Sequence, residues 1–202
     1  MHGRLAQGIC YGSLCQKIPE DTPKGYEMAG KNISLVPEVP LKILKSFATE
    51  KIPFVIVGGA AIALHGIPRS TLDIDIVVPA QAETVSRLFS IIQDAGFLSR
   101  DKYMITIAGS PHLLIGQWMT LQDNGGMEFI DIFFESGRKF NGLLKQAKKI
   151  KGGKFNFYIA SLDDIERMKK KSARAIDLAD IVLIREKRGH RKTSYKEKCK
   201  DV

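Results

Sequence analysis

The chain has 202 residues, of which 44% are hydrophobic, 26% charged and 8% aromatic, and its formal net charge is +9. This composition is typical of a globular domain with a sizeable core and excludes a chain that is disordered throughout. No apolar run reaches membrane-spanning length, and the first residues lack the apolar segment of a signal peptide, so we predict a cytoplasmic protein without a membrane partner.

Three segments are expected along the chain. Residues 1–37 are rich in Gly, Pro and Lys and show no sustained periodicity, which predicts a mobile N-terminal arm. Residues 38–184 are expected to form the folded domain. Residues 185–202 contain eight lysines and arginines against three acidic residues. A basic tail of this kind contacts nucleic acid or another polyanion about as often as it forms a solvated, disordered end.

The first half of the domain is expected to alternate helices and strands, because helical spacing of apolar residues alternates with β-rich apolar runs. The expected elements are a helix over 41–49, a strand over 53–57 that ends at a glycine pair, a short helix over 60–65, a strand over 72–78 and a helix over 83–95.

The second half is expected to continue without a regular βαβ rhythm. The expected elements are short β-like runs over 103–107 and 112–115, a strand over 128–134, a basic helix over 143–150, a strand over 154–159, a helix from Ser161 and a helix over 173–187. The segments around the turn at 123–126 are expected to form a hairpin, and Ser161 is expected to cap its helix through Asp164. This order predicts an α/β (α+β) fold, a small mixed sheet with packed helices.

Two aspartates, Asp73 and Asp75, lie in the predicted strand over 72–78. Side chains alternate between the faces of a strand, so these carboxylates share one face, roughly 7 Å apart between Cα atoms, while the apolar residues from Leu72 to Val78 face the core. Two like charges this close are costly unless a cation neutralises them, and hard oxygen ligands suit Mg²⁺ or Mn²⁺. Seen alone, such a pair is more often an acidic strand facing solvent.

The glycine pair Gly58-Gly59 favours a functional site over an acidic strand that merely faces solvent. It joins a predicted strand to a predicted helix, and such a turn presents backbone N–H groups and a helix N-terminus to an anion such as a triphosphate. Glycines let a phosphate approach the backbone without a Cβ clash. Arg69 lies between the two motifs and is a candidate to hold a phosphate bidentately, with an ordinary surface arginine as the alternative.

In this order, Gly58-Gly59, Asp73-Ile-Asp75 and a later isolated aspartate on a strand resemble the polymerase-beta-like nucleotidyltransferase superfamily. The stretch from Gly58 to Val78 is similar to its branch of small prokaryotic abortive-infection and toxin–antitoxin proteins. One departure is Gly59, because the superfamily often has a serine there whose hydroxyl helps to hold a phosphate.

The resemblance implies a third carboxylate on a neighbouring strand. Its best match is Asp131, which shares a predicted strand face with Phe129 and Phe133 and would need a partner if buried. Glu128 and Asp123 are weaker candidates, since both lie nearer the turn.

A second feature of the same branch lies near the end of the domain. It comprises Met168-Lys169, then Arg174, and then a helix with Asp177 and Asp180. By resemblance, Lys169 and Arg174 would face the nucleotide phosphates. The open alternative is that lysines 169–171 form a solvated helix face and that Arg174 pairs with Asp177.

The resemblance implies an enzyme, a Mg²⁺- or Mn²⁺-dependent nucleotidyltransferase that binds ATP or another nucleoside triphosphate and transfers the nucleoside monophosphate to a hydroxyl of RNA, a protein or a small molecule. The implied catalytic and metal-binding residues are Asp73, Asp75 and Asp131, and the implied nucleotide-binding residues are Gly58, Gly59, Arg69, Lys169 and Arg174. A partner antitoxin or toxin is also implied.

Two alternatives stay open. The first is a non-catalytic antitoxin or interaction module with this fold, against which the retention of three carboxylates argues. The second is an unrelated α/β protein with a chance acidic strand, which predicts that Asp131 lies far from Asp73 and Asp75.

Overall fold

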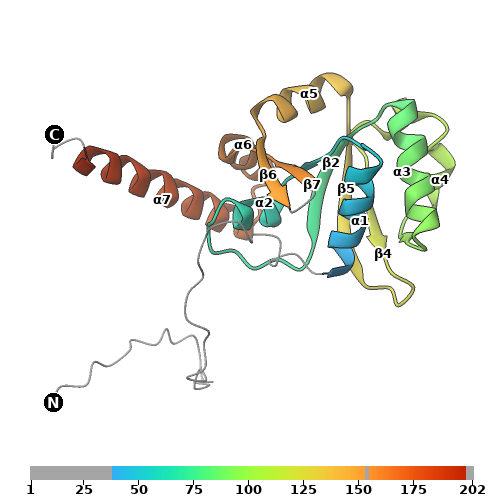
Figure 1. The fold of residues 1–202 in the computed structure, drawn as a ribbon, viewed down its shortest axis with the longest axis horizontal. Helices are drawn as coiled ribbons and strands as arrows, with labels where there is room; N and C mark the ends of the chain where they lie inside the picture. Colours follow the sequence, from blue (N-terminus) through green and yellow to red (C-terminus); the bar gives the residue numbers. More distant parts are fainter. Residues whose placement is uncertain (1–37, 153–154, 199–202) are drawn as a thin grey trace, which may run out of the picture.

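The structure, a computed structural model, describes residues 38–152 and 155–198. Within these residues a seven-stranded mixed sheet has the order β3-β4-β5-β2-β1-β7-β6 (Figure 1). The strands are β1 (Val55–Ile56), β2 (Ile74–Pro79), β3 (Leu98–Ser99), β4 (Trp118–Gln122), β5 (Glu128–Glu135), β6 (Lys148–Gly152) and β7 (Phe155–Ile159). The pairs β2–β5 and β1–β7 are parallel, and the other neighbours are antiparallel. The predicted mixed α/β fold and the predicted β4–β5 hairpin are confirmed.

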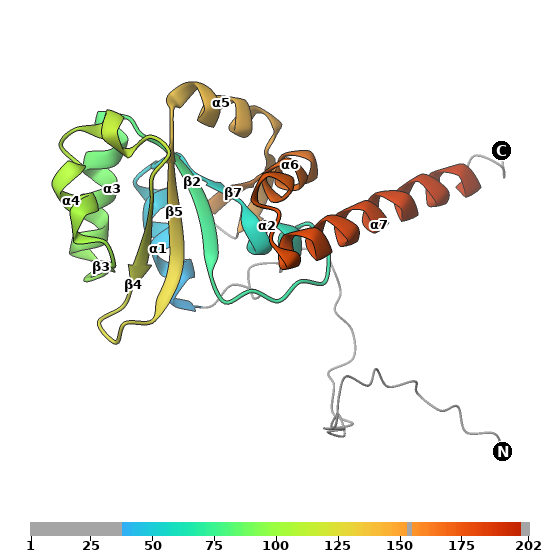
Figure 2. The same ribbon diagram turned by 180° about the vertical axis from the view of Figure 1, so that it is seen from behind.

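Helices cover the sheet unevenly. They are α1 (Glu38–Thr49), α2 (Gly58–Leu64), α3 (Ala82–Asp94), α4 (Lys102–Ile107), α5 (Gly137–Gln146), α6 (Leu162–Ser172) and α7 (Ala175–Lys198), with a 3₁₀ helix, η2 (Pro111–Leu114). In the two ribbon views α1 and α3 lie over one face of the sheet, whereas no helix lies in front of β5 and β2 on the opposite face (Figure 2). Among the described residues, no helix is both long and apolar enough to cross a membrane.

The core is built on the covered face of β2 and β5. The two strands bury apolar side chains in register: Ile74 with Ile130, Ile76 with Ile132 and Val78 with Phe134. Each such side chain contributes about 1.5–3 kcal/mol when it is fully buried. Because side chains alternate along a strand, the same pairing turns the intervening residues of both strands toward the open face.

Two predicted strands are wrong, because residues 103–107 and 112–115 form α4 and part of η2. In α4 the buried side chains are Met104 and Ile107, three positions apart, while Tyr103 and Ile105 are exposed. That spacing places the buried pair on one helical face. A short apolar run fits a strand and a helix equally well until its packing partners are known.

Two predicted boundaries are also wrong. The predicted helix over 143–150 ends at Gln146, and β6 follows it as an edge strand whose lysines suit an exposed sheet edge. The predicted strand over 72–78 begins only at Ile74. Leu72 therefore lies outside the core and is 87% exposed.

Helices α6 and α7 meet at a sharp break. Ser161 caps α6 as predicted, since its Oγ accepts a hydrogen bond of 3.1 Å from the backbone N–H of Asp164. Helix α6 ends at Ser172 and is followed by its C-cap residue Ala173, whose φ is 54°. Helix α7 then runs to Lys198, so the predicted boundary at residue 185 is not the end of an element. The prediction of a mobile arm falls on residues 1–37, which lie outside the described residues.

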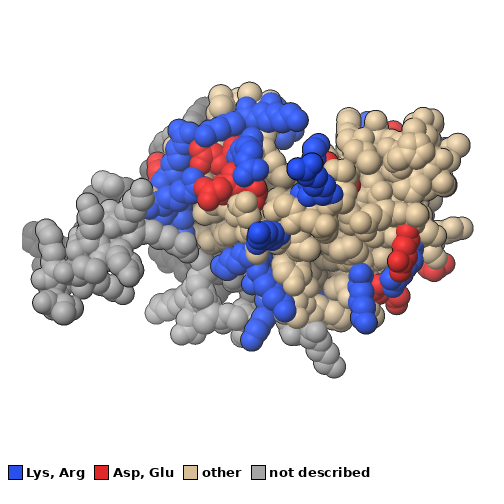
Figure 3. All heavy atoms as spheres, turned by 90° about the horizontal axis from the view of Figure 1, so that it is seen from above, with Lys and Arg blue, Asp and Glu red and all other residues tan. Residues whose placement is uncertain are grey.

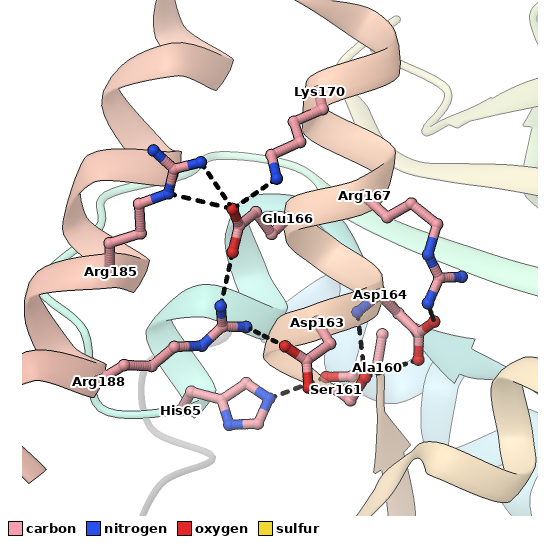
Figure 4. A network of polar contacts seen from close by, with 10 residues as sticks. All are labelled: His65, Ala160, Ser161, Asp163, Asp164, Glu166, Arg167, Lys170, Arg185 and Arg188. Atoms are coloured by element: carbon pink, nitrogen blue, oxygen red, sulfur yellow. Dashed lines mark hydrogen bonds and ion pairs between the residues drawn. The ribbon is translucent and has the colours of Figure 1, made fainter. Parts of the chain in front are cut away.

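The first basic residues of the predicted tail are held inside the fold (Figure 4). Arg185 and Arg188 of α7 donate to the Glu166 carboxylate of α6, at 3.0 Å and 2.6 Å, and Lys170 lies 2.9 Å from it. Lys187 Nζ donates to the Gly66 carbonyl at 3.2 Å. Seen from above, basic side chains surround an acidic patch on the left, and a second group of acidic and basic side chains lies at the lower right (Figure 3). These bases therefore tie α7 to α6 and to the end of α2.

This network predicts an acid-sensitive contribution to stability. Glu166 is 7% exposed, and its hydrogen bond to Lys170, followed by those to Arg185 and Arg188, lowers its pKa to about 2. A carboxylate whose pKa falls on folding stabilises the protein above its ordinary pKa, and this stabilisation is lost as the pH falls from about 4.5 toward 2. We expect Glu166→Gln to lower the free energy of unfolding in urea by about 2 kcal/mol at pH 6, the cost of losing charged hydrogen bonds.

At pH 3 the difference between Glu166→Gln and the wild type should shrink. Glu83→Gln changes a carboxylate whose side chain is 86% exposed and serves as the control. Equal free energies of unfolding for the wild type and Glu166→Gln at both pH values would show that the network does not stabilise the fold.

Candidate functional site

Two carboxylates stand side by side on the open face of the sheet. Asp75 of β2 and Asp131 of β5 are register partners in a parallel pair, so their strands lie about 4.8 Å apart. Asp73 lies just before β2. Burial, together with the smaller effects of the charges of Asp73 and then Asp131, raises the pKa of Asp75 to about 6. The hypothesis of a chance acidic strand with Asp131 far from the pair is therefore wrong.

Asp131 is oriented by a threonine of the next strand. Thr120 of β4 is its register partner and donates a hydrogen bond of 2.6 Å to Asp131 Oδ1. Burial raises the pKa of Asp131, and this hydrogen bond opposes the rise. The sequence argument missed Thr120, although the alternation of β4 between the buried Met119 and Leu121 would have placed it on the same face.

A second threonine orients Asp73. Thr71 Oγ1 donates to Asp73 Oδ1 at 2.7 Å. A Cβ atom at Gly59 would lie 3.1 Å from this hydroxyl oxygen and 3.6 Å from Arg69 Cζ. Thr71 therefore crowds the position of the serine side chain that the superfamily often carries at this turn.

Only a glycine fits at position 58, where the turn packs against the carboxylate of Asp75. Its φ is +64°, a conformation that costs an L-residue free energy. A Cβ atom built on Gly58 would lie 1.7 Å from Asp75 Oδ2. The backbone N–H of Val57 also donates to the Asp75 carbonyl at 2.8 Å. The glycine turn and the acidic strand thus form one packed unit.

A cluster of bases and acids lies at the α6–α7 junction. Lys169 has a side chain that is 9% exposed, and its Nζ lies 2.8 Å from Asp177 Oδ1 and 2.7 Å from Asp180 Oδ2. Arg69 Nε donates to Asp180 Oδ1 at 2.8 Å, and Arg174 Nε donates to Asp177 Oδ2 at 2.8 Å. Hydrogen bonds from Arg174 and Lys169 hold the pKa of Asp177 well below its usual range.

This cluster lies close enough to the carboxylates to act on their charge. Lys169 and Arg174 both lower the pKa of Asp75, opposing its rise, and Asp75 contributes to the raised pKa of Arg174. The hypothesis of a solvated lysine face is wrong for Lys169, which is buried, whereas Lys170 and Lys171 are exposed. The predicted Arg174–Asp177 pair is present.

The weaker candidates for a third carboxylate have other partners. Glu128 Oε1 lies 3.1 Å from Arg100, and Asp123 Oδ1 accepts backbone hydrogen bonds within the β4–β5 turn. Among residues 38–152 and 155–198, no group of three or more His, Cys, Asp or Glu side chains is arranged as a preformed metal site.

Comparisons with known proteins address the fold. No protein-family model and no curated protein sequence matches the chain. The solved structure of the lincosamide antibiotic adenylyltransferase LnuA, bound to lincomycin, matches with a TM-score of 0.53 and 15% identity, covering 74% of this chain and 97% of that one. ANT(2″)-Ia in complex with adenylyl-2″-tobramycin matches with a TM-score of 0.50 and 14% identity, covering 78% and 91%. At these identities the likeness shows the fold alone, which is that of nucleotidyltransferases.

The contact at Gly58 predicts the effect of a single methyl group. Gly58→Ala should lower the free energy of unfolding by more than the roughly 1–2 kcal/mol that a left-handed alanine costs, because its Cβ also displaces the Asp75 carboxylate. Gly96→Ala is the matched control, since Gly96 has a φ of +73° and nothing within 4 Å of its added Cβ. If both variants lost the same free energy of unfolding in urea, the contact between residue 58 and Asp75 would be refuted.

Proposed function

We propose that the protein is a metal-dependent nucleotidyltransferase, which transfers a nucleoside monophosphate from a nucleoside triphosphate to an acceptor hydroxyl. The observation that carries the proposal is the register of Asp75 against Asp131, beside a glycine turn and opposite the buried Lys169. The fold shared with an adenylyltransferase supports it.

The residues on the open face offer the kind of ligand that a hard divalent cation prefers, although they are not arranged as a preformed metal site. Asp73, Asp75 and Asp131 offer carboxylate oxygens, which Mg²⁺ and Mn²⁺ prefer. Their mutual repulsion contributes to the raised pKa of Asp75, and a cation among them would relieve that repulsion. When bound, the cation would polarise the phosphate and lower the pKa of the attacking hydroxyl.

The chain's own groups then have distinct roles. Asp131, held by the Thr120 hydroxyl, accepts the proton of the attacking hydroxyl as its oxygen bonds to the α-phosphorus. The bond between the α-phosphorus and the bridging oxygen breaks, and pyrophosphate leaves. The backbone of Gly58 and Gly59, beside Arg69, stabilises the leaving charge.

Lys169 and Arg174 bind the same phosphates in this proposal, and Asp177 and Asp180 are positioning residues. Buried carboxylates that hold bases at 2.7–2.8 Å fix them before the nucleotide arrives. Such preorganisation avoids the cost of ordering flexible cations during the reaction.

The proposal also includes a partner protein, as in toxin–antitoxin systems. Similarity of the stretch from Gly58 to Val78 to abortive-infection and toxin–antitoxin nucleotidyltransferases supports a partner toxin or antitoxin. A non-catalytic module with this fold is the competing proposal. It predicts that incubation with each α-labelled nucleoside triphosphate, Mg²⁺ and total RNA or cell lysate yields no labelled acceptor.

Removing one carboxylate tests the catalytic role. Asp75→Asn should reduce transfer of label by at least about a hundredfold, the effect of losing one charged group that acts in the transition state. Its free energy of unfolding should stay the same or rise, because one of three repelling charges is gone. Asp94→Asn, at an exposed position of α3, is the control. Wild-type transfer rates in Asp75→Asn would be incompatible with the mechanism.

The proposed phosphate role of the buried lysine has its own test. Lys169→Gln should weaken binding of the nucleoside triphosphate with Mg²⁺ by about tenfold or more, since a charged hydrogen bond to phosphate contributes about 1.5–3 kcal/mol. Lys171→Gln, at an exposed position of the same helix, should bind as the wild type does. Equilibrium dialysis with labelled nucleotide measures both, and equal affinities would remove Lys169 from the site.

A further inference from the structure

An exposed tryptophan lies on the same face of the sheet as the carboxylates. Trp118 is the only tryptophan of the chain and is 55% exposed. Its register partner is Phe133, two positions after Asp131 on β5. Directly opposite residues of an antiparallel pair share a face, so Trp118 and Phe133 stand beside Thr120 and Asp131. Neither the carboxylate chemistry nor the core explains why so large an apolar ring remains in solvent at this position.

The position of Trp118 sets what it can contact. It is the diagonal neighbour of Asp131, at roughly 7–8 Å, a separation that an aromatic side chain can span. A flat ring stacked on Trp118 would therefore keep its substituents within reach of the Asp131 carboxylate.

The strand order separates this surface from the proposed phosphate site. Trp118 is on β4, the carboxylates are on or next to β5 and β2, and the turn at Gly58 follows β1. The sheet runs β4-β5-β2-β1, so Trp118 and Gly58 lie on opposite sides of the carboxylates. This places the tryptophan on the acceptor side of the site and not on the triphosphate side.

A basic side chain, that of Arg100, lies near Asp131 on the acceptor side. The backbone N–H of Arg100 donates to the Thr120 carbonyl at 3.0 Å, which continues the β3–β4 register and puts Arg100 on the same face. Its side chain is 61% exposed, and one of its guanidinium nitrogens lies 3.1 Å from Glu128 Oε1. The net charge of +9 attracts a polyanion and repels a polycation such as an aminoglycoside.

We propose that Trp118 binds the acceptor, and that the acceptor is the 3′-terminal nucleoside of a single-stranded RNA. Its base stacks on Trp118 beside Phe133, its ribose hydroxyl lies at Asp131, and Arg100 holds the adjoining phosphate. This proposal rests on the proposed function and adds its acceptor. The step is unchanged: the ribose oxygen bonds to the α-phosphorus, its proton passes to Asp131, and pyrophosphate leaves.

The single tryptophan gives a binding readout that needs no catalysis. We expect a short single-stranded oligoribonucleotide to quench the fluorescence of Trp118 in the full chain. The same oligonucleotide with an abasic 3′ end should bind about tenfold to a hundredfold more weakly, the loss expected for one stacked base. Absence of quenching by the oligonucleotide overturns the proposal. Quenching by a nucleoside triphosphate alone, without quenching by the oligonucleotide, also overturns it by assigning the ring to the donor.

Kinetics separate this proposal from the proposed function. Trp118→Ala should raise the KM for the oligonucleotide about tenfold or more and leave the KM for the nucleoside triphosphate unchanged, and Trp118→Phe should restore much of the loss. Tyr103→Ala, at a 68% exposed aromatic of α4, is the matched control. An unchanged KM for the oligonucleotide in Trp118→Ala overturns the proposed acceptor site but not the proposed nucleotidyltransferase activity. If no variant transfers nucleotide, the proposed function fails, and the quenching measurement still decides whether RNA contacts Trp118.

Discussion

The parallel register of β2 on β5 is the constraint on which the site depends. It sets Asp75 directly against Asp131 and buries the alternate apolar residues of both strands on the other face. A slip of either strand by one residue would turn its aspartate into the core and expose its isoleucines. Burial on the covered face therefore offsets the repulsion on the open face, because the two faces cannot change independently. The turn at Gly58 belongs to the same unit, since its missing side chain leaves the space that Asp75 occupies.

Acidic and basic side chains alternate from the β2–β5 pair toward helices α6 and α7. Asp75 of β2 interacts electrostatically with Lys169 and Arg174, and these bases are held by Asp177 and Asp180 of α7. A buried lysine keeps its charge only with such partners. The outer acids thus provide ion-pair partners for Lys169, whose side chain is only 9% exposed. Arg185 and Arg188 of α7 donate hydrogen bonds to Glu166 of α6 and so hold α7 against α6.

The sequence predicts much of this arrangement, and the failures have physical reasons. Alternation along a strand predicted that Asp73 and Asp75 share a face, because period-two alternation is local, whereas Asp131 was selected through the family resemblance. It failed for Leu72, since the start of a strand depends on its neighbours. The runs around Tyr103 and Leu114 were assigned to strands because a short apolar run leaves helix and strand undecided. Thr120 and Glu166 went unnoticed because Asp131, Arg185 and Arg188, which they contact, lie on other elements. Thr71 was missed although its partner Asp73 is only two residues away. The basic residues after 184 were interpreted as a tail, whereas Arg185, Lys187 and Arg188 bond inside the fold.

Binding of Mn²⁺ is the most direct measure of the central claim, that three aspartates from β2, β5 and the loop before β2 form one cation site. Electron paramagnetic resonance of free Mn²⁺ would be followed during titration with the wild-type chain and with an Asp75→Asn, Asp131→Asn double variant, each with a nucleoside triphosphate present at equal concentration. The account predicts that the wild type removes more Mn²⁺ from solution than the nucleotide alone does, and that the double variant removes no more than the nucleotide alone. Equal uptake by the two proteins would contradict it.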